Sequence, residues 1–271
     1  MRLLVTNDDG VGAPGIAALA AALLDAGHEV VVAAPADDRS GASAAIGGMH
    51  LDETIEVQPV EPEGLEGATC YSVVASPALV VIVACLGGFG PAPDLVVSGI
   101  NAGANTGRAV LHSGTVGAAL TAANFGRSGL AVSQALGRPF RWPTATALAV
   151  PALDWLAAQP APQVVNLNAP DLALEEVRGV RDAGLAPFGT VRAAVVEAKG
   201  GLQMELTGDG EGVSGDDVTG DDVPSDDVPS DSDTGLLRAG YATLTCLTGL
   251  GAVARPDAVA AVEQRFPVRT G

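Results

Sequence analysis

The chain has 271 residues, of which 48% are hydrophobic, enough for one large globular domain with a buried core. Its formal net charge of -18 argues against direct binding to nucleic acid or to an anionic membrane, and no apolar run reaches the roughly 18 residues of a membrane-spanning helix. The three cysteines, Cys70, Cys85 and Cys246, form no CxxC pair, which favours reduced thiols in a cytoplasmic protein over disulfides or a zinc site.

Apolar strands alternate with Ala-rich helices along the first 170 residues. The pattern predicts strands over residues 2–6, 29–34, 94–98, 130–133 and 163–168. It predicts helices over residues 14–26, 77–86, 115–125 and 144–158. Strands that alternate with helices are typical of a Rossmann-like α/β fold, so we expect a mostly parallel sheet with helices on both faces.

The pattern weakens after Pro170. Residues 191–206 suggest a β arm or hairpin, residues 241–245 a strand, and residues 258–266 a terminal helix. Between Asp209 and Asp233 there are ten acidic residues and no basic ones, including a five-residue repeat that starts at residue 215. We interpret residues 209–233 as a flexible, charge-repelled loop rather than a calcium site. A single domain over residues 1–271 follows, with a core of about residues 1–185 and a C-terminal arm of about residues 186–271.

The run Thr6-Asn7-Asp8-Asp9-Gly10 stands where the first predicted strand ends. Ligands of open α/β sheets bind beyond the carboxyl ends of the strands. Two adjacent carboxylates there repel each other, and a hard cation such as Mg²⁺ or Mn²⁺ removes the conflict. A solvated Asp-Asp turn is the alternative interpretation.

The residues that follow also spell a G-x-G-x-x-G pattern, with Gly10, Gly12 and Gly15. Asp37 and Asp38 close the second strand at about the distance at which a dinucleotide fold binds ribose, so an NAD-dependent enzyme is a minor alternative. Against it, Asp8 and Asp9 would press negative charge towards the pyrophosphate.

Polar residues follow two further strands. The segment Ser98-Gly99-Ile100-Asn101 continues through Gly103 to Asn105 and offers amide oxygens to a metal or amide donors to an oxyanion. Ser113-Gly114-Thr115 opens a helix whose free N–H groups suit phosphate. Asp38-Arg39-Ser40-Gly41 follows the second strand, so three strand ends are expected to converge on one site.

Together these motifs resemble the SurE family of stationary-phase survival proteins, which are metal-dependent 5'/3'-nucleotidases with broader phosphatase activity. The resemblance is close over the first 135 residues and continues weakly in Asn166-Leu167-Asn168-Ala169-Pro170 and in Gly240 to Thr245. It implies a phosphomonoesterase that acts on nucleoside monophosphates or another small phosphate ester. It also implies a homodimer or homotetramer with a swapped C-terminal arm.

The resemblance also implies a site. One divalent ion, Mg²⁺ or Mn²⁺, is expected on Asp8, Asp9, Ser40 and Asn101, with one of the two aspartates acting as the catalytic base. Phosphate or substrate contacts are expected from Asn7, Gly41, Ser43, Asn105, Ser113, Gly114 and Thr115.

Four positions depart from the family pattern: Leu79 replaces an acidic residue, His112 a tyrosine, Thr121 a glutamate and Ala122 a glycine. The Gly-Thr-Asp that typically precedes the last strand is displaced by the Asp-rich repeat. These departures leave open a phosphatase for another phosphate ester, or a non-catalytic binding protein.

Overall fold

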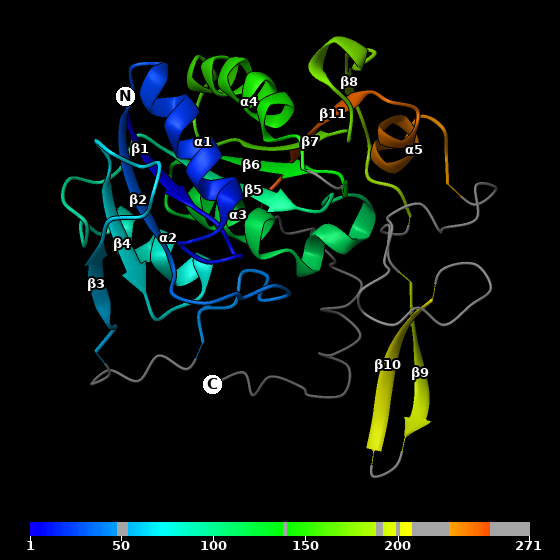
Figure 1. The fold of residues 1–271 in the computed structure, drawn as a ribbon, viewed down its shortest axis with the longest axis horizontal. Coiled ribbons are helices and arrows are strands. Elements are labelled where there is room, and N and C mark those ends of the chain that lie inside the picture. The colour runs from blue at the N-terminus through cyan, green and yellow to red at the C-terminus, as the bar shows by residue number, and fades with distance from the viewer. Residues whose placement is uncertain (48–53, 138–139, 188–191, 199–200, 208–227, 250–271) are drawn as a thin grey trace, which may run out of the picture.

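Nine strands form the main sheet, in the order β3-β4-β2-β1-β5-β6-β7-β11-β8 (Figure 1). The computed structural model describes residues 1–47, 54–137, 140–187, 192–198, 201–207 and 228–249. Six of the eight strand pairings are parallel; β3 against β4 and β11 against β7 are antiparallel. The strands are β1 (Arg2–Thr6), β2 (Glu29–Pro35), β3 (Val57–Val60), β4 (Thr69–Val73), β5 (Leu95–Ala102), β6 (Ser128–Gln134), β7 (Val164–Ala169), β8 (Val180–Asp182) and β11 (Ala242–Leu247).

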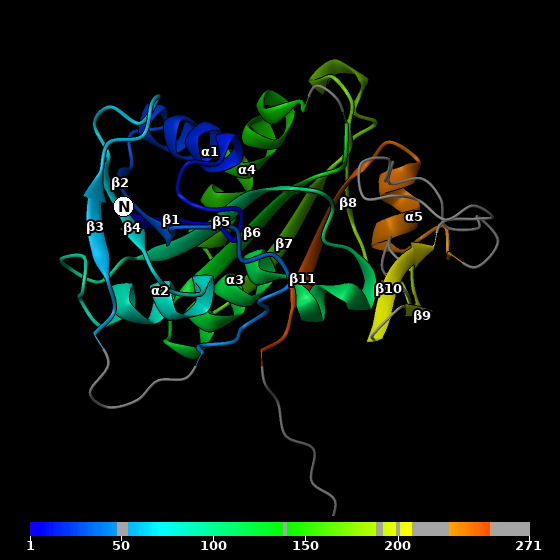
Figure 2. The same cartoon turned by 60° about the horizontal axis from the view of Figure 1, so that its bottom comes forward.

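Helices cover both faces of the sheet, as Figure 2 shows. One face carries α1 (Pro14–Asp25) and α4 (Trp142–Ala157), and the other carries α2 (Pro77–Cys85) and α3 (Gly114–Asn124). The remaining helices are short: the 3₁₀ helices η1 (Gly107–His112) and η2 (Leu174–Glu176), and α5 (Asp233–Arg238). The mostly parallel α/β sheet expected from the sequence is confirmed.

Alternation along the central strands divides the core between these two faces. Leu3 and Val5 of β1 pack with Ile16 of α1 and Leu153 of α4, whereas Leu4 points to the opposite face and packs with Val80 of α2. Successive side chains of a strand point to opposite faces of the sheet. A continuous apolar strand is therefore what a sheet with helices on both sides requires.

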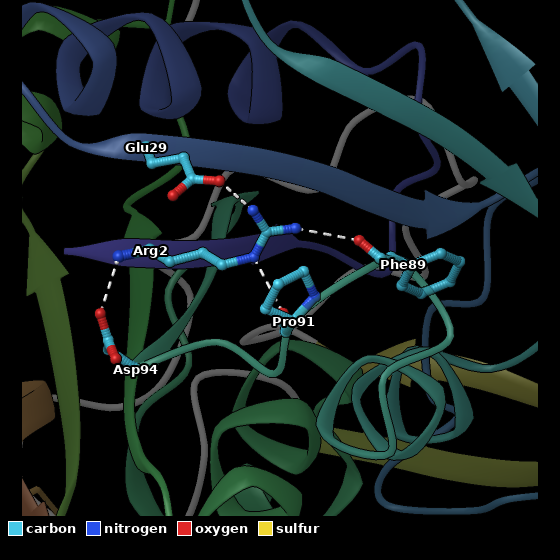
Figure 3. A network of polar contacts seen from close by, with 5 residues as sticks. All are labelled: Arg2, Glu29, Phe89, Pro91 and Asp94. Atoms are coloured by element: carbon cyan, nitrogen blue, oxygen red, sulfur yellow. Dashed lines mark hydrogen bonds and ion pairs between the residues drawn. The ribbon is translucent and has the colours of Figure 1, made fainter.

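The amino end of the sheet is held by Arg2, whose contacts are drawn in Figure 3. Its guanidinium pairs with Glu29 and donates to the carbonyl oxygens of Pro91 at 2.9 Å and Phe89 at 3.0 Å. Its backbone N–H donates to Asp94 Oδ2 at 2.8 Å. Arg2 thus joins β1 to β2 and to the segment before β5, at the edge of the sheet opposite the carboxyl ends.

The predicted hairpin is present as β9 (Arg192–Ala198) and β10 (Gly201–Thr207), which pair in antiparallel register apart from the main sheet (Figure 1). Part of the acidic segment predicted to be flexible is structured, because Ser232 and Asp233 open α5 and both are buried. The predicted terminal helix, residues 258–266, and the repeat from residue 215 lie outside the described residues. No helix among the described residues has both the length and the apolarity to cross a membrane.

Candidate active site

The side chain of Asp8 is the centre of the polar groups at the carboxyl edge of the sheet. It lies just beyond β1 and is only 4% exposed. The Thr115 hydroxyl, in the first turn of α3, donates to Asp8 Oδ1 at 2.5 Å. The backbone N–H of Arg39 donates to the carbonyl oxygen of Asp8 at 2.7 Å. Two segments distant in sequence therefore meet at this one aspartate.

The first turn of α3 is built to approach that carboxylate. Ser113 caps the helix, its Oγ accepting from the Val116 N–H at 3.1 Å. A Cβ added to Gly114 would lie 2.6 Å from Asp8 Oδ2, so only glycine allows this approach. Burial raises the pKa of Asp8, while the Thr115 hydroxyl and the contacts with the backbone of Thr115 and Gly114 act to lower it.

Asp9 is partly exposed and lies between two other loops. Its pKa is raised to about 6, first by burial and then by the negative charges of Asp8 and Asp38. The backbone N–H of Ala102 acts to lower it. Asp9 therefore lies close to the loop that follows β2 and to the end of β5.

Ser40 lies in the loop after β2, and Asn101 is the second-to-last residue of β5. Ser40 is exposed, follows Arg39 directly, and donates its backbone N–H to Asp38 Oδ1 at 2.7 Å. Asn101 directs Nδ2 to the carbonyl oxygen of Gly103 at 2.7 Å, which leaves its Oδ1 free to coordinate a cation. The segments that carry the four predicted metal ligands thus meet at one edge of the sheet.

These four side chains fit a hard divalent cation. They offer two carboxylates, a hydroxyl and an amide, which are the oxygen donors that Mg²⁺ and Mn²⁺ prefer. In the described part of the chain no three His, Cys, Asp or Glu side chains gather as a metal cluster. Burial raises the pKa of both Asp8 and Asp9, and the negative charges of Asp8 and Asp38 raise that of Asp9 further, whereas a bound cation would favour the ionised form of both.

Two residues predicted to contact substrate make hydrogen bonds within the protein. Asn7 is fully buried, and its Nδ2 donates to the carbonyl oxygen of Gly10 at 2.9 Å, bracing the turn behind Asp8. Asn105 directs its Nδ2 to Ser133 Oγ at 2.8 Å, and its carbonyl oxygen accepts from the side chains of Asn166 and Asn168. Both side chains therefore also support the loops of the site, and their contact with substrate stays a prediction.

The other predicted contacts lie in the loop after β2 and at the start of α3. Gly41 is exposed in the loop after β2, with a left-handed φ of 79°. Ser43 donates through Oγ to the carbonyl oxygen of Leu111 at 2.6 Å, which ties the same loop to η1. Ser113, Gly114 and Thr115 form the start of α3 beside Asp8, as described above.

The departures from the family pattern fall mainly on packing positions. Leu79 and Ala122 are buried in the core between α2 and α3, and Thr121 donates to the carbonyl oxygen of Gly117 at 2.7 Å within α3. His112 is exposed at the end of η1. Leu79, Ala122 and Thr121 thus have packing roles within α2 and α3.

The third glycine of the dinucleotide-like pattern has a packing reason. A Cβ on Gly15 would lie 2.1 Å from the carbonyl oxygen of Ile100, so glycine is required where α1 crosses β5. The pattern is therefore accounted for without a pyrophosphate.

Two neighbours of the site were not singled out from the sequence. The Ala102 N–H lowers the pKa of Asp9, and Asp233 holds the start of η1 by accepting from the Gly107 N–H at 2.8 Å. For Asp233 a signal existed, because Ser232-Asp233-Thr234 before an apolar pair is typical of a helix start. This helix start was missed because it directly follows the acidic run that we interpreted as a flexible loop.

Comparison with known proteins agrees with this architecture. The sequence model of the family described as "Survival protein SurE" matches residues 3–193. The protein is 43% identical over 183 residues to a protein named 5'-nucleotidase SurE from Xanthomonas axonopodis pv. citri, covering 66% of this chain and 67% of the relative. It is 42% identical over 184 residues to a protein of the same name from Nitratidesulfovibrio vulgaris, covering 67% of this chain and 66% of that relative.

A solved structure shares the fold. The crystal structure of the SurE protein from Aquifex aeolicus superposes with a TM-score of 0.73 at 23% identity, covering 98% of this chain and 100% of the other. The family model spans more than half of the chain and ends inside the hairpin strand β9. The chain therefore belongs to the SurE survival protein family.

Proposed function

We propose that this protein hydrolyses phosphate monoesters, and that nucleoside 5'- and 3'-monophosphates are its substrates. Membership of a family whose similar members are named 5'-nucleotidase supports the reaction class. One observation of the site carries the proposal: the start of α3 is held against the carboxylate of Asp8 by Thr115. The positive end of a helix dipole beside a pair of carboxylates suits a phosphate group and a metal ion side by side.

Asp8, Asp9, Ser40 and Asn101 would hold one divalent ion, Mg²⁺ or Mn²⁺. When bound, such an ion polarises a phosphoryl oxygen and lowers the pKa of a water molecule, which makes a nucleophile near neutral pH. The amide Oδ1 of Asn101 and the exposed hydroxyl of Ser40 add neutral oxygen donors to the two charged ones. The two carboxylates balance the two positive charges of the ion, and the two neutral donors add coordination without adding charge.

The protein's own groups orient the phosphate. The helix dipole at the start of α3 would stabilise the phosphate oxygens and the charge that develops on them, since the first N–H groups of the helix already bond to Asp8 and Ser113. Gly114 lets this turn lie against Asp8 without a side chain in between. Of the two carboxylates, Asp9 is the partly exposed one and is assigned to accept the proton from the attacking water.

Three further expectations stay proposals. Another small phosphate ester remains an alternative substrate, because His112 is exposed beside the site. We propose a homodimer or homotetramer, which is supported by a hollow of about 780 Å³ lined by apolar residues such as Leu111, which is 68% exposed. A cytoplasmic location, expected from the unpaired cysteines, is tested by cell fractionation.

Phosphate release tests the proposal. The purified protein should release inorganic phosphate from AMP, GMP and 3'-AMP with Mg²⁺ or Mn²⁺, and EDTA should abolish the release. Asp8→Asn and Asp9→Asn should each lower the rate more than about 100-fold, because each removes a charged ligand. Asp25→Asn, at the exposed end of α1, makes the same chemical change away from the site and should be neutral. Undiminished turnover in Asp8→Asn would refute the proposal.

A further inference from the structure

Asp233 is a fully buried carboxylate, 0% exposed, in the C-terminal part of the chain. Its Oδ2 accepts from the Gly107 N–H at 2.8 Å. Its Oδ1 accepts from the backbone N–H groups of Ala186 at 2.9 Å and Thr234 at 2.7 Å. A buried carboxylate is tolerated only when its oxygens are hydrogen-bonded, and here three backbone amides do so. The geometry of Gly107 is therefore set by a residue 126 positions away.

The attachment extends to the next residue of η1. The backbone N–H of Arg108 donates to the carbonyl oxygen of Ala186 at 3.1 Å, and Asp233 itself donates its N–H to the carbonyl oxygen of Gly184 at 2.9 Å. Gly107 is buried and has a left-handed φ of 60°, which glycine adopts without strain. The start of η1 is thus fixed on two sides by the segment around Ala186 and by Asp233.

The other end of η1 leads to both halves of the site. His112 is followed directly by Ser113, Gly114 and Thr115, the turn that contacts Asp8. One residue earlier, the carbonyl oxygen of Leu111 accepts from Ser43 Oγ at 2.6 Å. The backbone of Ser43 also rests on α3, because a Cβ on Gly117 would lie 2.4 Å from its carbonyl group. Thus η1 lies between Asp233 and the loop that carries Ser40.

We propose that Asp233 is a positioning residue for this site: through η1 it sets the place of the first turn of α3 and of the loop over residues 39–43. Asp233 touches neither substrate nor Asp8; it acts by holding Gly107. The inference rests on the proposed phosphomonoesterase activity for its kinetic consequence. Its structural consequence, a tighter loop over residues 39–43, does not depend on that activity.

The substitution Asp233→Asn tests the inference with almost no change in volume. An asparagine keeps one acceptor oxygen, so its Nδ2 must face either the Gly107 N–H or the two N–H groups of Ala186 and Thr234. In either orientation the Nδ2 donor of the asparagine faces a backbone N–H donor, so at least one of the hydrogen bonds made by Asp233 is lost. Asp231→Asn, two residues away and exposed, is the matched control.

Hydrogen exchange of the backbone amides gives the structural readout. We expect Asp233→Asn to speed exchange by about tenfold in residues 39–45, far from the substitution in the chain, as well as in η1. Asp231→Asn should leave both segments unchanged. Faster exchange confined to residues 184–187 and 233–238, with residues 39–45 unchanged, would overturn the inference.

Kinetics give the second readout. With AMP and Mn²⁺ we expect kcat of Asp233→Asn to fall about tenfold while KM changes less than about threefold, because mispositioned donors weaken the transition state. Unchanged kcat in a variant with a lowered melting temperature would show a role in stability alone and overturn the inference. If the wild type hydrolyses no phosphate ester, the proposed function is wrong. The exchange experiment would still test whether Asp233 holds the loop over residues 39–43.

Ser43→Ala provides a second route in case Asp233→Asn does not fold. It removes only the contact between Ser43 Oγ and the carbonyl oxygen of Leu111, at a half-buried residue. Exchange in residues 39–45 should again rise, while η1 and Asp233 stay protected. No rise would show that η1 does not hold the loop, which contradicts the proposal.

Discussion

Thr115 Oγ1 and Asp8 Oδ1 lie 2.5 Å apart, joining the start of α3 to the end of β1 across 107 positions of sequence. This contact turns a helix start towards a pair of carboxylates, which is the arrangement that a metal-assisted phosphatase needs. The relationship also makes the site sensitive to small changes in the first turn of α3.

Removing the Thr115 hydroxyl should weaken the site more than the fold. Thr115→Val keeps the shape but leaves the buried Asp8 carboxylate without its side-chain donor, at a cost of about 1 to 3 kcal/mol in the free energy of unfolding. The pKa of Asp8 should rise further, and kcat with AMP and Mn²⁺ should fall. Thr121→Val, which removes a buried hydroxyl six residues further along α3, is the control and should retain kcat.

A methyl group at residue 114 should separate α3 from Asp8. The Cβ of Gly114→Ala would lie 2.6 Å from Asp8 Oδ2 and 2.7 Å from Asp8 Cβ, so the helix start or the carboxylate must move. A displacement of this kind is expected to lower kcat by about 100-fold. Gly12→Ala meets no atom within 4 Å and should behave like the wild type. Equal rates for the two variants would contradict the close approach.

The raised pKa of Asp9 should make the free energy of unfolding of the metal-free protein depend on pH. Its pKa is about 6 in the folded protein against 3.8 as the ordinary value, so the folded state binds the proton more tightly. The resulting stabilisation is complete below about pH 3.8 and is lost as the pH rises through 6. Because Asp9 is partly exposed, we expect on the order of 1 to 2 kcal/mol.

Asp9→Asn removes this titration and is the variant to compare. The free energy of unfolding of both proteins is measured by urea denaturation in EDTA. Between pH 4 and pH 6.5 the wild type should lose stability relative to Asp9→Asn. Saturating Mn²⁺ should reverse the shift by favouring the ionised carboxylate. A difference that is flat with pH would show that Asp9 ionises normally.

The opposite edge of the sheet should affect stability alone. Arg2→Met keeps the length of the stem but removes the guanidinium that bonds to Phe89, Pro91 and Glu29 (Figure 3), and should cost about 1 to 3 kcal/mol. Glu29→Gln removes only the exposed partner and should cost less than about 1 kcal/mol. Both variants should keep the wild-type kcat, and a loss of kcat in Arg2→Met would show coupling across the sheet.

The buried strands and long helices could be predicted from sequence because their residues repeat one simple pattern. The predicted helix over residues 14–26 is α1 (Pro14–Asp25), and the strand over residues 2–6 is β1 without change. In contrast, β3 (Val57–Val60) is largely exposed and contains a proline, and all three residues of β8 are exposed. Edge strands of this kind are held by their neighbours rather than by their own apolar pattern.

The site was predictable only in part for a similar reason. Asp8, Asp9 and the start of α3 follow strands or open a helix, so the topology alone brings them to one edge. The side-chain partners of Asn105 and Asp233 lie in segments that no local pattern connects to them, such as β6 and η1. Sequence therefore located the site but could not separate residues facing the ligand from residues that support it.

The central claim is that one divalent ion is bound by Asp8, Asp9, Ser40 and Asn101, and a crystal grown with Mn²⁺ tests it most directly. Anomalous diffraction should place a single strong peak within coordination distance of oxygen atoms from all four side chains. A peak elsewhere, or those four side chains turned away from one another around solvent, would contradict the account.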